Sequence, residues 1–230
     1  MILYAIPTPL GGAPQAVLPQ SVLETIRGLK DFAVENAKSA RAFLSEVGMP
    51  LAMREIQIQE IGENPETLLQ PLREGRPLGL LSEAGCPAIA DPGAALVEAA
   101  HREGFRVVPL VGPSSITLAL MASGLEGQRF AFCGYLPRET AERARRIKEL
   151  EARSKKESET EIFIETPYRS DALLGALLES CHARTRLFVA ADLTLPTESI
   201  STRDVSEWRK QKTVMGRRPA VFLLLAQSQG

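Results

Sequence analysis

The sequence lacks the signature motifs of several large enzyme classes. It contains no G-x-G-x-x-G run, which excludes the usual dinucleotide fingerprint, and no G-x-x-x-x-G-K-[ST] run, which excludes a P-loop. The nucleophile elbow G-x-S-x-G is also missing. Histidine is rare, because His101 and His182 are the only two, and both lie in predicted helices away from any matching motif. We therefore expect no metal site and no histidine-activated nucleophile.

Cysteine, net charge and long apolar runs are equally scarce. The three cysteines match no disulfide or metal spacing, which is typical of a protein from a reducing compartment. The 27 basic and 28 acidic residues nearly cancel, so the chain has no overall basic footprint for nucleic acid, and only a local patch could supply one. No apolar run reaches the length of a membrane span, and residues 1–12 lack a signal-peptide pattern. We expect a cytoplasmic globular protein with no membrane segment.

Short apolar segments alternate with helical periodicities along the chain, which indicates an α/β protein. Strands are predicted at 2–6, 31–35, 55–61, 78–82, 105–111, 130–137, 160–166, 186–194, 198–203 and 219–226. In the first half each strand leads through a loop into a predicted helix, so a mostly parallel sheet covered by helices is expected there. A domain boundary is predicted at residue 112. The charged segment 138–161 predicts an exposed helix that frays, the best candidate for a mobile element.

Three loops rich in glycine, proline and small residues follow predicted strands, at 7–12, 82–93 and 112–115. Ligands of open α/β sheets bind at the carboxyl ends of strands, so these loops predict a binding cleft. The loop SEAGCPAIADPG (82–93) has two acids and no Lys or Arg, which suits an uncharged or cationic ligand such as a sulfonium better than a phosphate. Asp91 and Pro92 stand where the N-cap and first residue of the next helix belong. Cys86 lacks a histidine partner, and we expect it to line a pocket rather than to act as a nucleophile.

Three segments in fixed order carry a resemblance to a known family: GCPAIADPG (85–93), VVPLVGPSSITLALMASG (107–124) and RFAFCGYLP (129–137). They resemble the tetrapyrrole methylase superfamily of S-adenosylmethionine-dependent methyltransferases, and within it the branch that includes the bacterial small-subunit ribosomal RNA cytidine 2′-O-methyltransferase. The resemblance runs over nearly the whole chain. It implies two α/β domains, residues 1–112 and 113–230, with a mixed C-terminal sheet, S-adenosylmethionine in the cleft between them, and a homodimer.

The resemblance also assigns residues that contact the cofactor, in the three loops and in two later strands. These residues are Pro9, Leu10, Gly85, Cys86, Pro87, Ile89, Ala90, Ser114, Ser115, Phe132, Tyr135 and Ala220. We add Glu83 because it is one of the two acids in the loop 82–93.

The positions that face the substrate in this family depart from the RNA branch. Glu-Asp-Thr-Arg is replaced by residues 35–38 (ENAK), Glu-Ser-Thr-His-Arg by residues 165–169 (ETPYR), and Arg-Glu-Leu-Thr-Lys by residues 191–195 (ADLTL). A hydroxyl acceptor needs a placed base, and an anionic acceptor needs a cation. The candidates for these roles are Glu35, Lys38, Glu165, Tyr168, Arg169 and Asp192. A helix cap or a structural ion pair is the alternative role for each of them.

Three functions fit these observations. The first is an RNA ribose 2′-O-methyltransferase, which the branch resemblance and the basic clusters at 143–146 and 217–218 support. The second is a methyltransferase of a tetrapyrrole or other small molecule, which the altered substrate positions and the balanced charge favour. The third is a cofactor-binding protein without catalysis.

Overall fold

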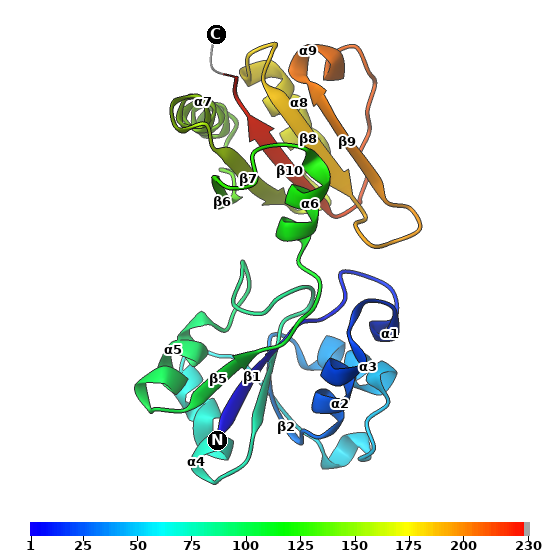
Figure 1. Cartoon of the computed structure of the whole chain (residues 1–230), viewed down its shortest axis with the longest axis vertical. Coiled ribbons are helices and arrows are strands. Elements are labelled where there is room, and N and C mark those ends of the chain that lie inside the picture. Colours follow the sequence, from blue (N-terminus) through cyan, green and yellow to red (C-terminus); the bar gives the residue numbers. More distant parts are fainter. Residues whose placement is uncertain (228–230) are drawn as a thin grey trace. The chain divides into compact units, whose positions relative to one another are not determined.

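The computed structural model describes residues 1–227. The chain divides into two compact units, Met1–Ser114 and a second one that begins at Ser115. Each unit has its own sheet with helices packed against it (Figure 1). The predicted α/β fold class is therefore confirmed.

Unit 1 (residues 1–114) is built on a parallel sheet. Its strands are β1 (Ile2–Ile6), β2 (Asp31–Val34), β3 (Gln57–Glu60), β4 (Leu78–Leu81) and β5 (Arg106–Pro109). They lie in the order β3-β2-β4-β1-β5, and every neighbouring pair is parallel. Its helices are α1 (Pro14–Val17), α2 (Gln20–Arg27), α3 (Ala37–Val47), the 3₁₀ turns η1 (Met53–Glu55) and η2 (Pro65–Leu69), α4 (Gln70–Arg73) and α5 (Ala94–Arg102). The parallel sheet expected from the strand–loop–helix pattern is confirmed.

Side chains alternate between the two faces of this sheet, and each face has its own core. Helices α2 and α3 cover one face and α4 and α5 the other (Figure 1). Phe32 and Ile6 pack in the first core, and Leu3 and Leu80 pack in the second. Gly79 makes room between the first two, because a Cβ at that position would lie 2.7 Å from the Phe32 ring and 2.8 Å from Ile6 Cδ1. Helices thus cover both faces, and the carboxyl edge of the sheet carries the loops.

The start of α5 differs from the sequence prediction. The helix begins at Ala94, with Gly93 at the N-cap and no side-chain cap, so the prediction of Asp91 and Pro92 as N-cap and first residue is wrong. Gly93 has a φ of 128°, and a Cβ there would lie 3.0 Å from Leu80 Cδ2. The chain turns sharply against the sheet at this glycine, so the helix starts after it. The Asp91 carboxylate is therefore available for another role.

The sequence from about Pro65 to Glu74, closed by Gly75, predicts one helix, but in the structure this segment is split into η2 and α4. Pro71 has no N–H to donate and its ring obstructs the preceding turn, which ends the first element and starts the second. The helix prediction is right in position and wrong in type for the first turn.

Unit 2 is built on a mixed sheet. Its elements are α6 (Ser115–Ser123), β6 (Phe130–Tyr135), α7 (Thr140–Glu157), β7 (Thr160–Glu165), α8 (Ser170–Ser180), β8 (Arg186–Ala191), β9 (Ser199–Asp204), α9 (Val205–Trp208) and β10 (Ala220–Leu225). The strand order is β6-β7-β10-β8-β9, with β6 and β7 parallel and the other pairs antiparallel. This confirms the mixed C-terminal sheet. Across residues 1–227, no helix combines the length and the apolar character needed to cross a bilayer.

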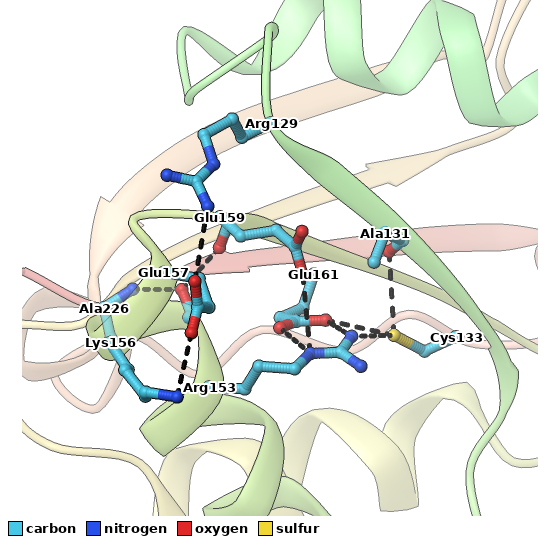
Figure 2. A network of polar contacts seen from close by, with 10 residues as sticks. Arg129, Ala131, Cys133, Arg153, Lys156, Glu157, Glu159, Glu161 and Ala226 are labelled. Atoms are coloured by element: carbon cyan, nitrogen blue, oxygen red, sulfur yellow. Dashed lines mark hydrogen bonds and ion pairs between the residues drawn. The ribbon is translucent and has the colours of Figure 1, made fainter.

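The charged segment 138–161 contains α7, a continuous helix with one buried face. Ile147 and Leu150 pack into the core of unit 2. Arg153 of the same helix forms an ion pair with the fully buried carboxylate of Glu161 in β7, beside the thiol of Cys133 (Figure 2). Burial, together with the Glu161 carboxylate, raises the pKa of Cys133 to about 11, so this thiol stays protonated at neutral pH. The segment packs as part of the core layer, in contrast to the fraying helix that its charge predicts.

Candidate functional site

Three loops meet at the carboxyl edge of the parallel sheet: residues 7–13 after β1, 82–93 after β4 and 110–114 after β5. Thr8 and Gly85 exchange two backbone hydrogen bonds, in which each N–H donates to the other's carbonyl at 2.9 and 3.0 Å. The thiol of Cys86 donates to the carbonyl of Pro113 at 3.5 Å. The three loops predicted from their composition are thus fastened to one another. We call this surface of unit 1 the three-loop edge.

Two glycines allow the loops of this edge to approach closely. At Gly112, a Cβ would lie 2.2 Å from Cγ of Pro7, so only glycine fits between the loops after β1 and β5. Gly85 has a φ of 80°, and a Cβ there would lie 3.4 Å from Leu10 Cδ2 and 3.9 Å from the carbonyl oxygen of Pro113. Backbone therefore lines this part of the edge, and a bound molecule could lie directly against it.

The loop after β4 holds strained backbone. Ala88 and Ala90 both have a φ of 65°, in the left-handed region that alanine rarely adopts. The turn is held by the N–H of Ala88, which donates to the Pro92 carbonyl at 3.3 Å. Between the two alanines, Ile89 is 50% exposed and offers an apolar surface. Strain of this kind costs about 1 kcal/mol or more per residue and clusters at binding sites, because the ligand-competent loop conformation is preformed.

Three carboxylates lie at the same edge. Glu35, which follows β2, accepts a hydrogen bond from the N–H of Glu83 at 2.9 Å. Partial burial raises the pKa of Asp91 to about 6, with the charge of Glu35 and, more weakly, that of Glu83 acting in the same direction and the hydroxyl of Ser82 opposing them. Within residues 1–227, no Lys or Arg forms an ion pair with any of these three acids. The edge therefore has a negative field and an acid that titrates close to neutrality.

Cys86 has the properties of a protonated thiol. Burial raises its pKa above the ordinary value, and the thiol donates to a neutral carbonyl. A nucleophilic cysteine requires the opposite environment, one that lowers the thiol pKa. This geometry favours the lining role predicted for Cys86 over the nucleophilic one.

The remaining predicted residues of unit 1 lie around this edge. Pro9 and Leu10 are half-buried in the first loop, and Pro87 is buried in the second. Ser114 is the last residue of the unit. Lys38 is exposed in the first turn of α3, where the N-cap is the side chain of Asn36, which accepts from the N–H groups of residues 38 and 39.

In unit 2 the predicted residues gather at one end of the mixed sheet. Ala220, the first residue of β10, is paired with Glu165 at the end of β7 and with Ala191 at the end of β8. Asp192 follows directly. Strand pairing thus brings together side chains from three segments that are far apart in the sequence, and we call this region the mixed-sheet end.

Glu165 and Arg169 form a buried ion pair at the mixed-sheet end. The side chain of Glu165 is 1% exposed, and its Oε1 and Oε2 both accept from Arg169 Nη2 at 2.6 Å. Oε1 also accepts from the N–H of Thr166 at 2.7 Å. Since both carboxylate oxygens are engaged, Glu165 acts here as the residue that fixes the guanidinium of Arg169.

Asp192 is paired in a similar way. Its Oδ2 accepts a hydrogen bond from the hydroxyl of Thr197 at 2.9 Å and lies 3.7 Å from Nη1 of Arg218. The backbone at Asp192 has a φ of 55° and that at Thr194 a φ of 72°, both in the left-handed region. Like the loop after β4, this turn holds two non-glycine residues at positive φ, and it also adjoins predicted site residues.

The other predicted residues of unit 2 are spread more widely. Tyr168 is exposed in the turn between β7 and α8, and the guanidinium of Arg217 lies 5.2 Å from its ring centroid. Tyr135 is exposed at the end of β6, beyond a bulge that separates it from Phe132. Phe132 is half-buried and pairs with Ile162 of β7, and Ser115 is the first residue of α6. Among the described residues, no group of three His, Cys, Asp or Glu side chains is placed to hold a metal ion.

Two features, one in each unit, were not anticipated from the sequence. Asp91 reads as a helix cap in the sequence, and only the conformation of Gly93 and the proximity of Glu35 reveal it as a titrating acid. The contact between Arg217 and Tyr168 joins residues 49 positions apart (217 minus 168), and no local pattern indicates it. The only feature of the sequence that points to this contact is the pair of arginines, 217 and 218, before β10.

The chain is similar to known methyltransferases. A family model described as Tetrapyrrole (Corrin/Porphyrin) Methylases matches residues 30–208. The chain is 34% identical over 200 residues to a protein from Mesorhizobium japonicum named Ribosomal RNA small subunit methyltransferase I, covering 87% of this chain and 66% of that protein. It is 32% identical over 228 residues to a protein of the same name from Escherichia coli O157:H7, covering 98% of this chain and 77% of that protein. The chain thus spans only part of the length of these relatives, just under two thirds in the first case.

The fold is also found among solved structures. The methyltransferase CobJ superposes with a TM-score of 0.63 at 16% sequence identity, covering 98% of this chain and 93% of that one. At this identity the likeness concerns the fold alone.

Proposed function

The chain belongs to the tetrapyrrole (corrin/porphyrin) methylase family, and from that membership we propose that it is a methyltransferase that uses S-adenosylmethionine to methylate a ribose 2′-hydroxyl of RNA. The choice of RNA is supported by relatives at 32–34% identity whose name is that of a ribosomal RNA methyltransferase. The observation that carries the proposal is the three-loop edge, whose negative field and exposed backbone suit a sulfonium cofactor. Cytoplasmic location is part of the same proposal.

The charge and the apolar groups of the three-loop edge support the binding of S-adenosylmethionine there. Gly85, Pro87 and Ile89 would hold it, with Pro9 and Leu10 from the neighbouring loop, because backbone and apolar groups are presented side by side there. The carboxylates of this edge complement a positive sulfonium. When bound, the cofactor supplies an electrophilic methyl group, and the protein's main contribution is to align it with the acceptor, which can lower the barrier by several kcal/mol. Of the other cofactor positions, Glu83, Cys86, Ala90 and Ser114 belong to the same edge, and Ser115, Phe132, Tyr135 and Ala220 to unit 2.

A ribose hydroxyl must lose its proton during methyl transfer, and we assign the proton acceptor to Asp91. A general base works best when its pKa lies near the working pH, and Asp91 titrates at about 6. Glu165 and Asp192 are engaged with Arg169 and Arg218, so we assign them to positioning these cations, which can hold phosphate oxygens of the acceptor. Glu35 would position the loop of Glu83 through its hydrogen bond, and Lys38 would assist in holding the acceptor.

Transfer of label from S-adenosylmethionine tests this function. The protein is incubated with methyl-labelled S-adenosylmethionine and total RNA from a strain that lacks it, and the RNA and small-molecule fractions are counted separately. Label in one RNA species supports the proposal. Label only in small molecules would replace RNA by a metabolite, and binding of S-adenosylmethionine without any transfer would leave a cofactor-binding protein.

A second candidate, a small anionic acceptor such as a tetrapyrrole, is favoured by one observation. The segments 35–38, 165–169 and 191–195, which the resemblance places at the substrate, depart from the pattern of the RNA branch. Addition of a carboxylated porphyrin to the same assay, in competition with RNA, separates the two candidates.

We also propose that the protein is a homodimer, as the family resemblance implies. Sedimentation velocity would then give a species of twice the chain mass of 25.0 kDa. A species of the single chain mass at micromolar concentration would rule the dimer out under those conditions.

A further inference from the structure

An exposed tyrosine and an exposed arginine form a contact at the mixed-sheet end that takes no part in the proposed proton transfer. Tyr168 is 77% exposed, although the guanidinium of Arg217 lies 5.2 Å from its ring centroid. Attraction between the cation and the ring quadrupole orients both groups. Most of the ring surface remains open to solvent, so it can receive another planar group.

The segment that carries Arg217 is basic and anchored. Residues 209–218 read RKQKTVMGRR, with no carboxylate. Met215 is buried, and its N–H donates to Oδ1 of Asp171 in α8 at 2.6 Å. This fixes the middle of the segment beside the turn that carries Tyr168, while its lysines and Arg217 stay exposed.

The two basic clusters noted in the sequence differ in their counterions. On α7, Arg145 and Arg146 lie 3.7 and 3.2 Å from carboxylate oxygens of Glu149, so the two arginines share one carboxylate as counterion within the helix. Within residues 1–227, by contrast, no carboxylate pairs with Arg217 or with the lysines of segment 209–218. Arg218 faces Asp192, but the charges of Arg217 and of the two lysines are available to an external polyanion, whose bound counterions they would release.

We propose that Tyr168 and Arg217 form a stacking platform for an unpaired base of the RNA substrate, and that the cations of segment 209–218 hold the adjacent phosphates; this rests on the proposed function. Proteins read single-stranded RNA by stacking splayed bases on aromatic rings and guanidinium planes, next to a basic track for the backbone. A tetrapyrrole would instead need a concave site that buries most of its surface, and this platform is open. Tyr168 thus contributes its ring rather than its phenolic oxygen, in place of the base role considered from the sequence.

Binding of a short RNA to the full chain tests the platform. The probe is a fluorescein-labelled, unstructured single-stranded RNA of about 12 nucleotides, a length in the range of single-strand sites, and its anisotropy gives the affinity. We expect Tyr168→Ala to weaken binding about 10-fold, within the range measured for removal of one base stack. Tyr168→Phe, which keeps the ring, should bind like the wild type. Arg217→Ala should weaken binding and reduce the slope of log K against log salt by about 0.7 for each phosphate that the arginine neutralises.

Arg145→Ala is the matched control, since it removes the same charge from an exposed arginine that is paired with Glu149. It should change neither the affinity nor the salt slope. All four substitutions are at exposed positions, and urea unfolding confirms that each variant is folded.

The outcomes separate this inference from the proposed function. If the wild type methylates RNA but Tyr168→Ala binds the probe as tightly as the wild type, the platform is wrong and the function stands. Equal losses in Tyr168→Ala and Tyr168→Phe would assign the effect to the hydroxyl group and overturn the stacking role. If the wild type neither binds the probe nor labels RNA, both proposals fall, and uptake of a carboxylated porphyrin would identify the alternative acceptor.

Discussion

The carboxylates of the two units differ in whether they have a cationic partner. At the three-loop edge of unit 1, Glu35, Glu83 and Asp91 have no cationic partner among the described residues, and Asp91 titrates near neutrality. At the mixed-sheet end of unit 2, Glu165 and Asp192 each face an arginine. Unpaired acids can accept a proton and attract a cation, whereas paired acids hold arginines that can bind an anion. This contrast supports our proposals that unit 1 binds the cofactor and that arginines of unit 2 contact an anionic acceptor.

Replacement of the unpaired acid should have the largest effect. Asp91→Asn removes the assigned proton acceptor, and we expect kcat to fall by about 10²- to 10⁴-fold, the usual contribution of a general base. The wild-type rate should decline as the pH falls through about 6, and this limb should be absent in the variant. Rates of label transfer measured from about pH 5 to about pH 9 bracket this titration and give both effects. An unchanged rate in Asp91→Asn would remove Asp91 from the chemistry.

The same substitution should stabilise the fold. The folded pKa of Asp91, about 6, is higher than the ordinary value of 3.8, so this group contributes stability at low pH that is lost as the pH rises through about 6. Asparagine avoids this loss. Because the side chain is partly exposed, we expect a gain of only about 1 kcal/mol in the free energy of unfolding at about pH 7.5, vanishing at about pH 4. Urea unfolding at the two pH values measures it, and a destabilised variant at the higher pH would contradict the unpaired state of this acid.

Replacement of a paired acid should lower the free energy of unfolding instead of raising it. Glu165→Gln leaves Arg169 without its charged partner, and we expect a loss of about 3 kcal/mol in the free energy of unfolding, since breaking a buried ion pair strands the remaining charge. Glu66→Gln is the matched control, because Glu66 pairs with Arg102 in an ion pair where both side chains are more than half exposed, and it should cost well under about 1 kcal/mol. Similar small losses in both variants would mean that the Glu165 pair behaves like a surface ion pair.

A side chain at Gly85 should disturb the three-loop edge without disturbing the mixed-sheet end. We expect Gly85→Val to cost about 2 kcal/mol of cofactor binding, or about 30-fold in Kd for S-adenosylmethionine, because the new side chain occupies the backbone surface proposed to contact the cofactor. Gly75→Val is the control for backbone strain, because Gly75 has a φ of 85° and no atom within 4 Å of its Cβ position. Calorimetry should show weakened binding in the first variant and normal binding in the second; equal effects would assign the loss to a general destabilisation of the fold by backbone strain.

The smallest effect is expected at Cys86, the cysteine of the loop after β4. Cys86→Ser keeps a small polar side chain beside Pro113, and we expect less than about a threefold change in cofactor Kd and in rate. Retained binding with a complete loss of transfer would restore a nucleophilic role for the thiol.

Much of the fold was predictable because its signals are local. Apolar runs such as LGLL and AVFLLL form buried strands, and Gly48 ends α3 in a left-handed conformation as its position indicates. The start of α5 was not predictable, because Asp91-Pro92 is a good local cap and the contact of Gly93 with Leu80 overrides it. Tertiary packing decided against local propensity there.

The candidate site was predictable in composition but not in pairing. The acids of residues 165 and 192 stand out in the sequence, yet their arginine partners depend on strand register and on the turn before β10. The basic cluster on α7 looked like a nucleic-acid footprint, and only the ion pairs reveal that two of its arginines share the carboxylate of Glu149. Which charges are compensated is a property of the folded chain, so it separates the two basic clusters only once the ion pairs are known.

The linkage of the transferred methyl group tests the central claim most directly. RNA labelled by the wild-type protein is hydrolysed in alkali, which cleaves beside every free 2′-hydroxyl and leaves a 2′-O-methylated nucleotide joined to its neighbour. The account predicts that the label is recovered in an alkali-resistant dinucleotide from one RNA species, and that Tyr168→Ala and Asp91→Asn reduce it. Recovery of all label in mononucleotides, or in small molecules outside the RNA, would contradict it.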